Sequence, residues 1–167
     1  RIAIFRALSL GRQIASALAA AHAKGIVHRD LKPANIVVVH DPAVTGGERA
    51  KLVDFGIAKL ADFGTAKQSL TGDAETGTRP GLILGTPQYM APEQCRAVHE
   101  VTDRADVYSL GIVLYQMLAG QLPFQGDPIR TMMKHLSEEP PRLREANPLL
   151  PSELEVLVHA MIAKDPA

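Results

Sequence analysis

The sequence predicts an α+β fold that is mainly α, in which a helical body carries a small β element. An Ala- and Leu-rich segment at residues 8–23 repeats its apolar residues at the spacing of one helix face. Short β-type runs follow at residues 26–28, 36–39 and 51–53, and each has the length of a short strand. From Thr102 onward the helical spacing returns. Helix, short strands and further helices are therefore expected in that order.

Three helices are predicted in the second half of the chain. Residues 106–120 are apolar almost all round, which is typical of a helix buried inside a core. Residues 127–138 begin with Asp-Pro, an N-cap followed by a proline that the first helical position accepts. Residues 152–163 begin with Ser-Glu-Leu-Glu, the pattern of a capping box.

Two segments are predicted to be loops. Residues 40–50 contain an Asp-Pro and a Gly-Gly pair, and such pairs mark turns. Residues 54–90 contain many Gly and Thr but few periodic apolar residues, so we expect a long and largely irregular segment. Irregular segments of this length in compact domains are usually functional or disordered.

The composition is that of an ordinary globular protein. The 167 residues are 46% hydrophobic and 22% charged. Eighteen Lys and Arg balance eighteen Asp and Glu, so no nucleic-acid partner is expected. No apolar run is long enough to span a bilayer, so we expect no membrane segment in this sequence. The single cysteine, Cys95, excludes an internal disulfide and fits a reducing, cytoplasmic compartment.

One octapeptide carries groups suited to phosphoryl transfer. His28–Asn35 is HRDLKPAN, which places Asp30, Lys32 and Asn35 within six residues of a turn. A carboxylate there can orient a hydroxyl, an ammonium can neutralise a phosphoryl group, and an amide oxygen can ligate Mg²⁺. The whole octapeptide is far more specific than the tripeptide HRD.

Four segments in order resemble the C-terminal lobe of a eukaryotic-type (Hanks-type) protein kinase. They are HRDLKPAN, an Asp-Phe-Gly (DFG) triplet, GTPQYMAPE at residues 85–93 and DVYSLG at residues 106–111. Lys32 after HRDL resembles the serine/threonine branch, and the segments around APE and DVYSLG resemble the bacterial enzymes. The resemblance covers essentially the whole chain and implies a helical kinase C-lobe with a short β-hairpin.

The resemblance implies a catalytic and ATP-binding set. Asp30 is implied as the residue that accepts or orients the substrate hydroxyl proton, and Lys32 as the residue that steadies the γ-phosphate. Thr86 would bond to both of them and favour Ser and Thr substrates. Asn35 would ligate a second Mg²⁺, with Mn²⁺ as an alternative metal, and Val37 would lie under the adenine of ATP.

The resemblance also implies structural residues. His28 would pack on Phe55 of the DFG triplet, which Gly56 completes. Asp106 would anchor the backbone of the catalytic loop from the buried helix. Glu93 of the APE triplet would pair with an arginine that lies beyond the end of this sequence.

Control by phosphorylation is implied by three further residues. Arg29 matches the arginine that pairs with a phosphorylated activation-loop residue in this family. Thr76 and Thr78 form a T-G-T pair between DFG and APE, like the paired threonines of bacterial kinases. We expect them to be autophosphorylation sites, with polar residues of a loop as the open alternative.

The DFG triplet occurs twice. KLVDFGIAK at residues 51–59 and KLADFGTAK at residues 59–67 are identical at seven of nine positions. We favour Asp54 over Asp62 as the metal ligand, because the triplet at 54 follows a better strand former and lies nearer to the catalytic loop. The copy could be a neutral duplication or a decoy that shifts register and gives an inactive state.

The chain corresponds to part of a kinase domain. It opens on Arg1 and carries no glycine-rich phosphate loop, no strand lysine and no helix glutamate upstream of the octapeptide. We therefore expect residues 1–167 to be a partial domain that is inactive alone. Its segments are the catalytic loop at 28–35, DFG at 54–56, the activation segment at 54–93 and a helical subdomain at 94–167.

Two functions stay open for the longer protein. The first is a protein serine/threonine kinase, whose partners are proteins with Ser or Thr hydroxyls and the missing N-lobe of the same chain. The second is a pseudokinase-like or truncated scaffold that binds without catalysis. A pseudokinase usually lacks a catalytic residue, and none is missing from this lobe, so the sequence favours the enzyme. A membrane anchor elsewhere in the full-length protein stays open.

Overall fold

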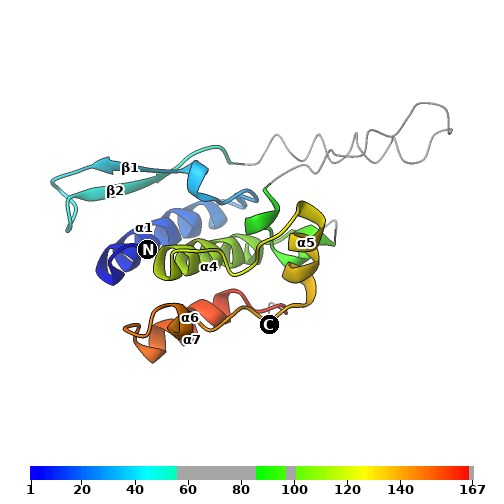
Figure 1. Ribbon diagram of the computed structural model, residues 1–167. Coiled ribbons are helices and arrows are strands. Elements are labelled where there is room, and N and C mark those ends of the chain that lie inside the picture. The colour runs from blue at the N-terminus through cyan, green and yellow to red at the C-terminus, as the bar shows by residue number, and fades with distance from the viewer. Residues whose placement is uncertain (56–85, 97–100, 166–167) are drawn as a thin grey trace.

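A computed structural model describes residues 1–55, 86–96 and 101–165 (Figure 1). Gly56, Asp62, Thr76 and Thr78 lie outside the described residues. The elements are α1 (Ile4–His22), 3₁₀ helix η1 (Pro33–Asn35), β1 (Ile36–His40), β2 (Glu48–Leu52), 3₁₀ helix η3 (Pro87–Tyr89), α3 (Pro92–Cys95), α4 (Arg104–Ala119), α5 (Pro128–Ser137), α6 (Leu143–Ala146) and α7 (Ser152–Met161). The structure is therefore mostly helical with one small sheet.

Helix α4 is the centre of the fold. It contacts α1 on one side and α6 and α7 on the other, and the β-hairpin lies against α1 (Figure 1). Ile112 and Leu118 are fully buried, which confirms the burial that its all-round apolar pattern predicts. Gly111 lets α7 approach, because a Cβ there would lie 2.6 Å from the Ile162 side chain. Apolar burial is thus concentrated on this helix.

Helix α1 buries one face against α4. The spacing of residues 8–23 predicts this face correctly, and Leu10, Ile14 and Leu18 are buried in it. The helix begins at Ile4, four residues earlier than its sequence predicts. No described helix is both long enough and apolar enough to cross a membrane.

The small sheet is an antiparallel hairpin of β1 and β2. Its register runs from Ile36 opposite Leu52 to His40 opposite Glu48, so the connecting loop is shorter than the predicted 40–50. The Gln13 side chain of α1 bonds to the edge of β2: its Nε2 donates to the Glu48 carbonyl (3.1 Å) and its Oε1 accepts from the Ala50 amide (3.0 Å). Helix α1 therefore fixes the strand that leads to Asp54.

Residues 26–28 are not a strand, and the prediction of one there is wrong. The Ile26 amide donates to the Ala21 carbonyl (3.0 Å), and the His28 amide donates to the Asp106 carboxylate (2.8 Å). Because these amides are already bonded to a helix end and to a side chain, they are not free for a sheet ladder. Tertiary contacts have overridden local strand propensity here.

The predicted N-terminal cap is confirmed for helix α5 and is wrong for helix α7. Asp127 caps α5, since its carboxylate accepts from the Arg130 amide (2.9 Å). The predicted capping box of α7 is wrong. Pro151 occupies the N-cap position, and the Ser152 hydroxyl donates to the Glu153 carboxylate (3.2 Å) instead.

Candidate active site

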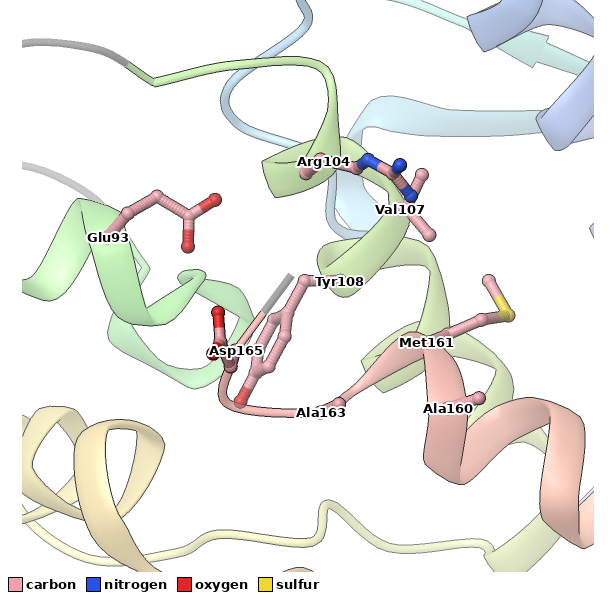
Figure 2. Close-up of a pocket in the computed structure, with 8 residues that line it drawn as sticks. All are labelled: Glu93, Arg104, Val107, Tyr108, Ala160, Met161, Ala163 and Asp165. Carbon is pink, nitrogen blue, oxygen red and sulfur yellow. The ribbon is translucent and has the colours of Figure 1, made fainter. Parts of the chain in front are cut away.

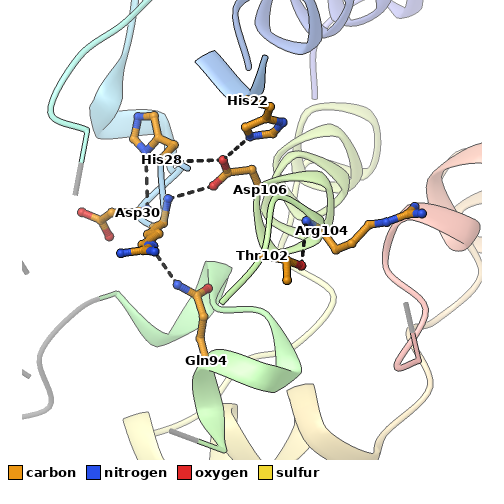
Figure 3. Close-up of polar contacts among 8 residues, drawn as sticks. His22, His28, Asp30, Gln94, Thr102, Arg104 and Asp106 are labelled. Carbon is orange, nitrogen blue, oxygen red and sulfur yellow. Dashed lines mark hydrogen bonds and ion pairs between the residues drawn. The ribbon is translucent and has the colours of Figure 1, made fainter. Parts of the chain in front are cut away.

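The predicted catalytic loop, residues 28–35, is held by a buried carboxylate. Asp106 of α4 is 1% exposed, and its two oxygens accept from the His28 and Arg29 amides, each at 2.8 Å (Figure 3). Arg29 has a φ of +65°, a left-handed conformation that is unfavourable for a residue with a side chain. Asp106 stabilises that conformation because it accepts from the two consecutive backbone amides of His28 and Arg29.

His22 is a functional contact that the sequence reasoning missed. Its Nε2 lies 2.7 Å from Oδ2 of Asp106, so the carboxylate contacts both α1 and the catalytic loop (Figure 3). No spacing could reveal this contact, because it joins residues that are 84 positions apart.

Three polar side chains meet around Asp30. The Lys32 ammonium lies 3.0 Å from the Asp30 carboxylate and donates to the Thr86 hydroxyl at 3.1 Å. The Asn35 amide nitrogen donates to the Asp30 carbonyl (2.8 Å) and lies 3.3 Å from its carboxylate. The Asp30 and Lys32 side chains are 14% and 21% exposed, so both are within reach of a bound molecule.

His28 connects the catalytic loop to the end of β2. Its ring is fully buried and lies 4.6 Å from the ring of Phe55, centroid to centroid. Its Nε2 lies 3.2 Å from the Val53 carbonyl, and the Val53 amide donates to the Asn35 carbonyl (3.0 Å). Asp54 lies between these contacts and has a φ of +55°. The backbone at Asp54 is therefore held beside residues 28–35.

Comparison with protein families decides what kind of domain this is. The family model for the protein kinase domain matches residues 4–167. The chain belongs to the protein kinase family. The four segments that carry the resemblance in the sequence are therefore those of a true member.

Similar kinases come from bacteria. Serine/threonine-protein kinase PknA of Mycobacterium tuberculosis is 40% identical over 100% of this chain and 34% of its own length. Serine/threonine-protein kinase PknE of the same organism is 42% identical, over 96% of this chain and 25% of its own length. Serine/threonine-protein kinase pkn3 of Myxococcus xanthus is 39% identical, over 97% and 28% respectively. The chain thus spans about a third or less of these relatives.

The kinase family uses ATP and a divalent metal, and the donors around Asp30 suit both. The two bonds from Asn35 to Asp30 use its amide nitrogen, so neither of them occupies the amide oxygen. The Asp54 carboxylate is exposed at the end of β2. An amide oxygen and one carboxylate, completed by phosphate oxygens and water, is an oxygen set that Mg²⁺ accepts.

The remaining predicted residues lie at three places. Val37 is on β1 and is 42% exposed. The Nε of Arg29 is buried and has no hydrogen-bond partner within the described ranges. Thr76, Thr78 and Gly56 lie outside the described residues, so their roles stay predictions.

Glu93 lies on the wall of a pocket that none of Asp30, Lys32, Asn35 and Thr86 lines. The pocket has a volume of about 250 Å³, and Arg104 and Tyr108 of α4 line other parts of it (Figure 2). Glu93 is half-buried and forms no ion pair within the part of the chain that is described. Its predicted pairing with an arginine beyond Ala167 stays a prediction.

Gln94 is a second contact that the sequence reasoning missed. It lies at the third position of α3, directly after Glu93, and its side chain reaches the catalytic loop (Figure 3). The segment that ends in APE is therefore joined to the catalytic loop at two points, through Thr86 and through Gln94.

Proposed function

We propose that this chain is the catalytic C-lobe of a protein serine/threonine kinase, which transfers the γ-phosphate of ATP to Ser and Thr hydroxyls of proteins. The observation that carries the proposal is the pair of Asp30 and Lys32 on an anchored loop, with the Thr86 hydroxyl of a second segment bonded to the Lys32 ammonium. Phosphoryl transfer depends mainly on positioning and on charge stabilisation, and this loop supplies both.

Each polar group has a defined task in the proposed reaction. The Asp30 carboxylate accepts a hydrogen bond from the substrate hydroxyl and takes its proton as the hydroxyl oxygen bonds to phosphorus. The Lys32 ammonium, held by Asp30 and Thr86, offers positive charge to the transferring phosphoryl group. The Thr86 hydroxyl fixes the direction of that ammonium, which favours the short Ser and Thr side chains.

Asn35 and Asp54 would hold the metal. Bound Mg²⁺, or Mn²⁺ as the alternative, neutralises phosphate charge. Asn35 is 5% exposed and tied to Asp30, so its oxygen is presented in a fixed direction. Asp54 follows β2, whose pairing with β1 begins one residue after Asn35, and this adjacency supports Asp54 over the copy at Asp62.

A smaller lobe of the same longer chain would complete the ATP site. Val37 is 42% exposed on β1, and an apolar side chain gains free energy when another surface covers it. We assign Val37 to the adenine ring of ATP. Without that lobe ATP has no cover on the hairpin side, so residues 1–167 alone are proposed to be inactive.

Arg29 supports control by phosphorylation. Its buried Nε without a described partner suits a charge-assisted bond to a phosphate on Thr76 or Thr78. A cytoplasmic location agrees with the use of ATP and with a single cysteine, Cys95.

The test is a phosphate-transfer assay on a longer chain that contains both this lobe and the small lobe proposed to precede it. The wild type is compared with Asp30→Asn, Asp54→Ala and Asp62→Ala, and with Asp103→Asn as a matched control at the exposed start of α4. Asp30→Asn should lower kcat by about 10³-fold or more, because the proton acceptor is lost. Asp54→Ala should abolish transfer, and Asp62→Ala should leave most of it.

Three results would contradict parts of the proposal. Full transfer by Asp30→Asn would refute the catalytic role of the loop. Loss of transfer in Asp62→Ala but not in Asp54→Ala would reverse the metal assignment. Binding of ATP or protein partners by a wild-type chain that transfers no phosphate would favour the scaffold function instead.

A further inference from the structure

We infer that Gln94 is a positioning residue for phosphate transfer, which holds the strained Arg29 peptide and thereby aims Asp30. The inference rests on the proposed function, since it assigns Gln94 a part in that reaction. Gln94 does not contact the substrate or ATP in this assignment. It acts only through the backbone of the catalytic loop.

The side-chain amide of Gln94 makes two hydrogen bonds, one as acceptor and one as donor. Its Oε1 accepts from the Ala91 amide at 3.0 Å, inside the turn that begins α3. Its Nε2 donates to the Arg29 carbonyl at 2.8 Å, across 65 positions of sequence (Figure 3). The first bond uses the acceptor of the amide and the second uses a donor, and at neutral pH no other side chain of this length supplies both.

The second bond falls at a strained position. Arg29 has its φ in the left-handed region, and its amide is held by Asp106 at 2.8 Å. Gln94 holds the carbonyl of the same residue. The Arg29 amide is therefore bonded to Asp106 of α4, and the Arg29 carbonyl is bonded to Gln94 of α3. Asp30 is the next residue along the chain. A peptide held at one side only would be freer to relax and to turn Asp30 away.

The same bond also fixes how two segments face each other. Lys32 of the catalytic loop bonds to Thr86, and Arg29 bonds to Gln94, so the loop and residues 86–94 meet at two separate points. One contact alone would leave a hinge between the segments, whereas two contacts set their relative direction. A substrate hydroxyl lying between them needs that direction to be constant.

A simpler role is that Gln94 only caps the short helix α3. Gln94→Glu separates the two roles, because the introduced carboxylate still accepts from the Ala91 amide but has no proton to donate to the Arg29 carbonyl. Gln94→Met removes both bonds at similar size. Gln116→Glu is the matched control. Among the described residues the Gln116 side chain makes one bond, which it accepts from the Tyr89 hydroxyl (2.8 Å), and the introduced carboxylate keeps that bond.

The experiment measures kcat and the KM for ATP of these variants in the same two-lobed chain, with thermal unfolding followed in parallel. Gln94→Glu and Gln94→Met should each lower kcat about tenfold with KM within about twofold of wild type. Gln116→Glu should leave kcat unchanged. The kcat of Gln94→Glu relative to wild type should recover as the pH falls from about 8 to about 4.5, where a glutamic acid becomes substantially protonated and can donate to the Arg29 carbonyl. Gln94→Met should show no recovery.

Several outcomes would overturn the inference. Wild-type kcat in Gln94→Glu would reduce Gln94 to a helix cap. A loss in Gln94→Glu that stays constant with pH, or that follows a fall in melting temperature equal to that of Gln94→Met, would assign the effect to folding. Asp30→Asn in the same assay separates failure of the proposed function from failure of this inference. If Asp30→Asn transfers phosphate normally, the proposed function fails. If Asp30→Asn is inactive while Gln94→Glu has wild-type kcat, only the inference about Gln94 fails.

Discussion

The catalytic loop and the helical body are held together by different forces. Around Asp30 the contacts are polar: carboxylates, amides and an ammonium hold a backbone with left-handed φ angles at Arg29 and Asp54. In the body, side chains such as Ile112 and Leu118 are fully buried around α4, and apolar packing dominates. The catalytic loop is thus polar and strained, and the helices packed around α4, which we call the frame, are held together by apolar contacts.

The contrast predicts how substitutions in each region behave. Polar bonds between exposed or half-buried groups contribute little net free energy to folding, because water replaces them in the unfolded chain. They direct side chains, however, and direction governs phosphoryl transfer. Changes in the loop should therefore affect kcat more than stability, and changes in the frame should affect stability more than kcat. Asp106 belongs to both regions.

The largest effect is expected from Asp106→Ala. The substitution leaves the His28 and Arg29 amides without their acceptor inside the protein, and an unpaired buried amide costs about 1–3 kcal/mol. We expect the free energy of unfolding to fall by about 3 kcal/mol and phosphate transfer to be lost as well. Urea unfolding of the chain and the transfer assay measure the two effects.

Asp103→Ala is the control for this prediction. Asp103 lies three residues earlier at the exposed N-terminus of α4, and its side chain makes no capping bond. It should change neither quantity by a large amount. Equal losses in Asp103→Ala and Asp106→Ala would show that the start of α4, rather than the buried carboxylate, supports the loop.

Sequence reasoning works best where a function is local. Asp30, Lys32 and Asn35 lie within six residues, so their meeting is a property of one turn, and the sequence predicts it. His22 and Gln94 reach the loop across 84 and 65 positions, and nothing in their neighbourhood indicates those contacts. The burial of α4 was predictable because an all-round apolar helix has few alternatives. The predicted strand at 26–28 fails because the Ile26 amide bonds to the end of α1 and the His28 amide bonds to the distant Asp106.

A smaller effect, confined to the frame, is expected from acid. His135 of α5 is fully buried; its Nδ1 lies 2.8 Å from the Tyr108 hydroxyl, and the rings of Tyr108 and Phe124 surround it. Burial, with a further contribution from the Lys164 ammonium, lowers the pKa of His135 to about 4. The unfolded chain binds this proton near pH 6.5 and the folded chain does not, so stability falls as the pH drops from about 6.5 to about 4.

At about pH 5 this linkage amounts to about 2 kcal/mol. It should appear as a steeper pH dependence of the wild-type free energy of unfolding than that of His135→Gln. His40→Gln, at an exposed histidine of β1, should keep the wild-type slope. If the unfolding free energies of wild type and His135→Gln had the same slope against pH, His135 would bind its proton as readily in the folded protein as in the unfolded chain.

The smallest effect is expected where the frame meets the loop, at Gln13. Gln13→Ala removes both bonds to the edge of β2, and the Glu48 carbonyl and Ala50 amide there can turn to water. We expect a loss of about 1 kcal/mol in unfolding free energy and faster hydrogen exchange at Ala50. Gln125→Ala, which removes one exposed bond of 3.4 Å, is the control and should change neither. If Gln13→Ala lowers kcat but leaves the free energy of unfolding unchanged, the β1–β2 hairpin that leads to Asp54 behaves as part of the catalytic loop. In that case the contact of α1 with β2 serves catalysis more than folding.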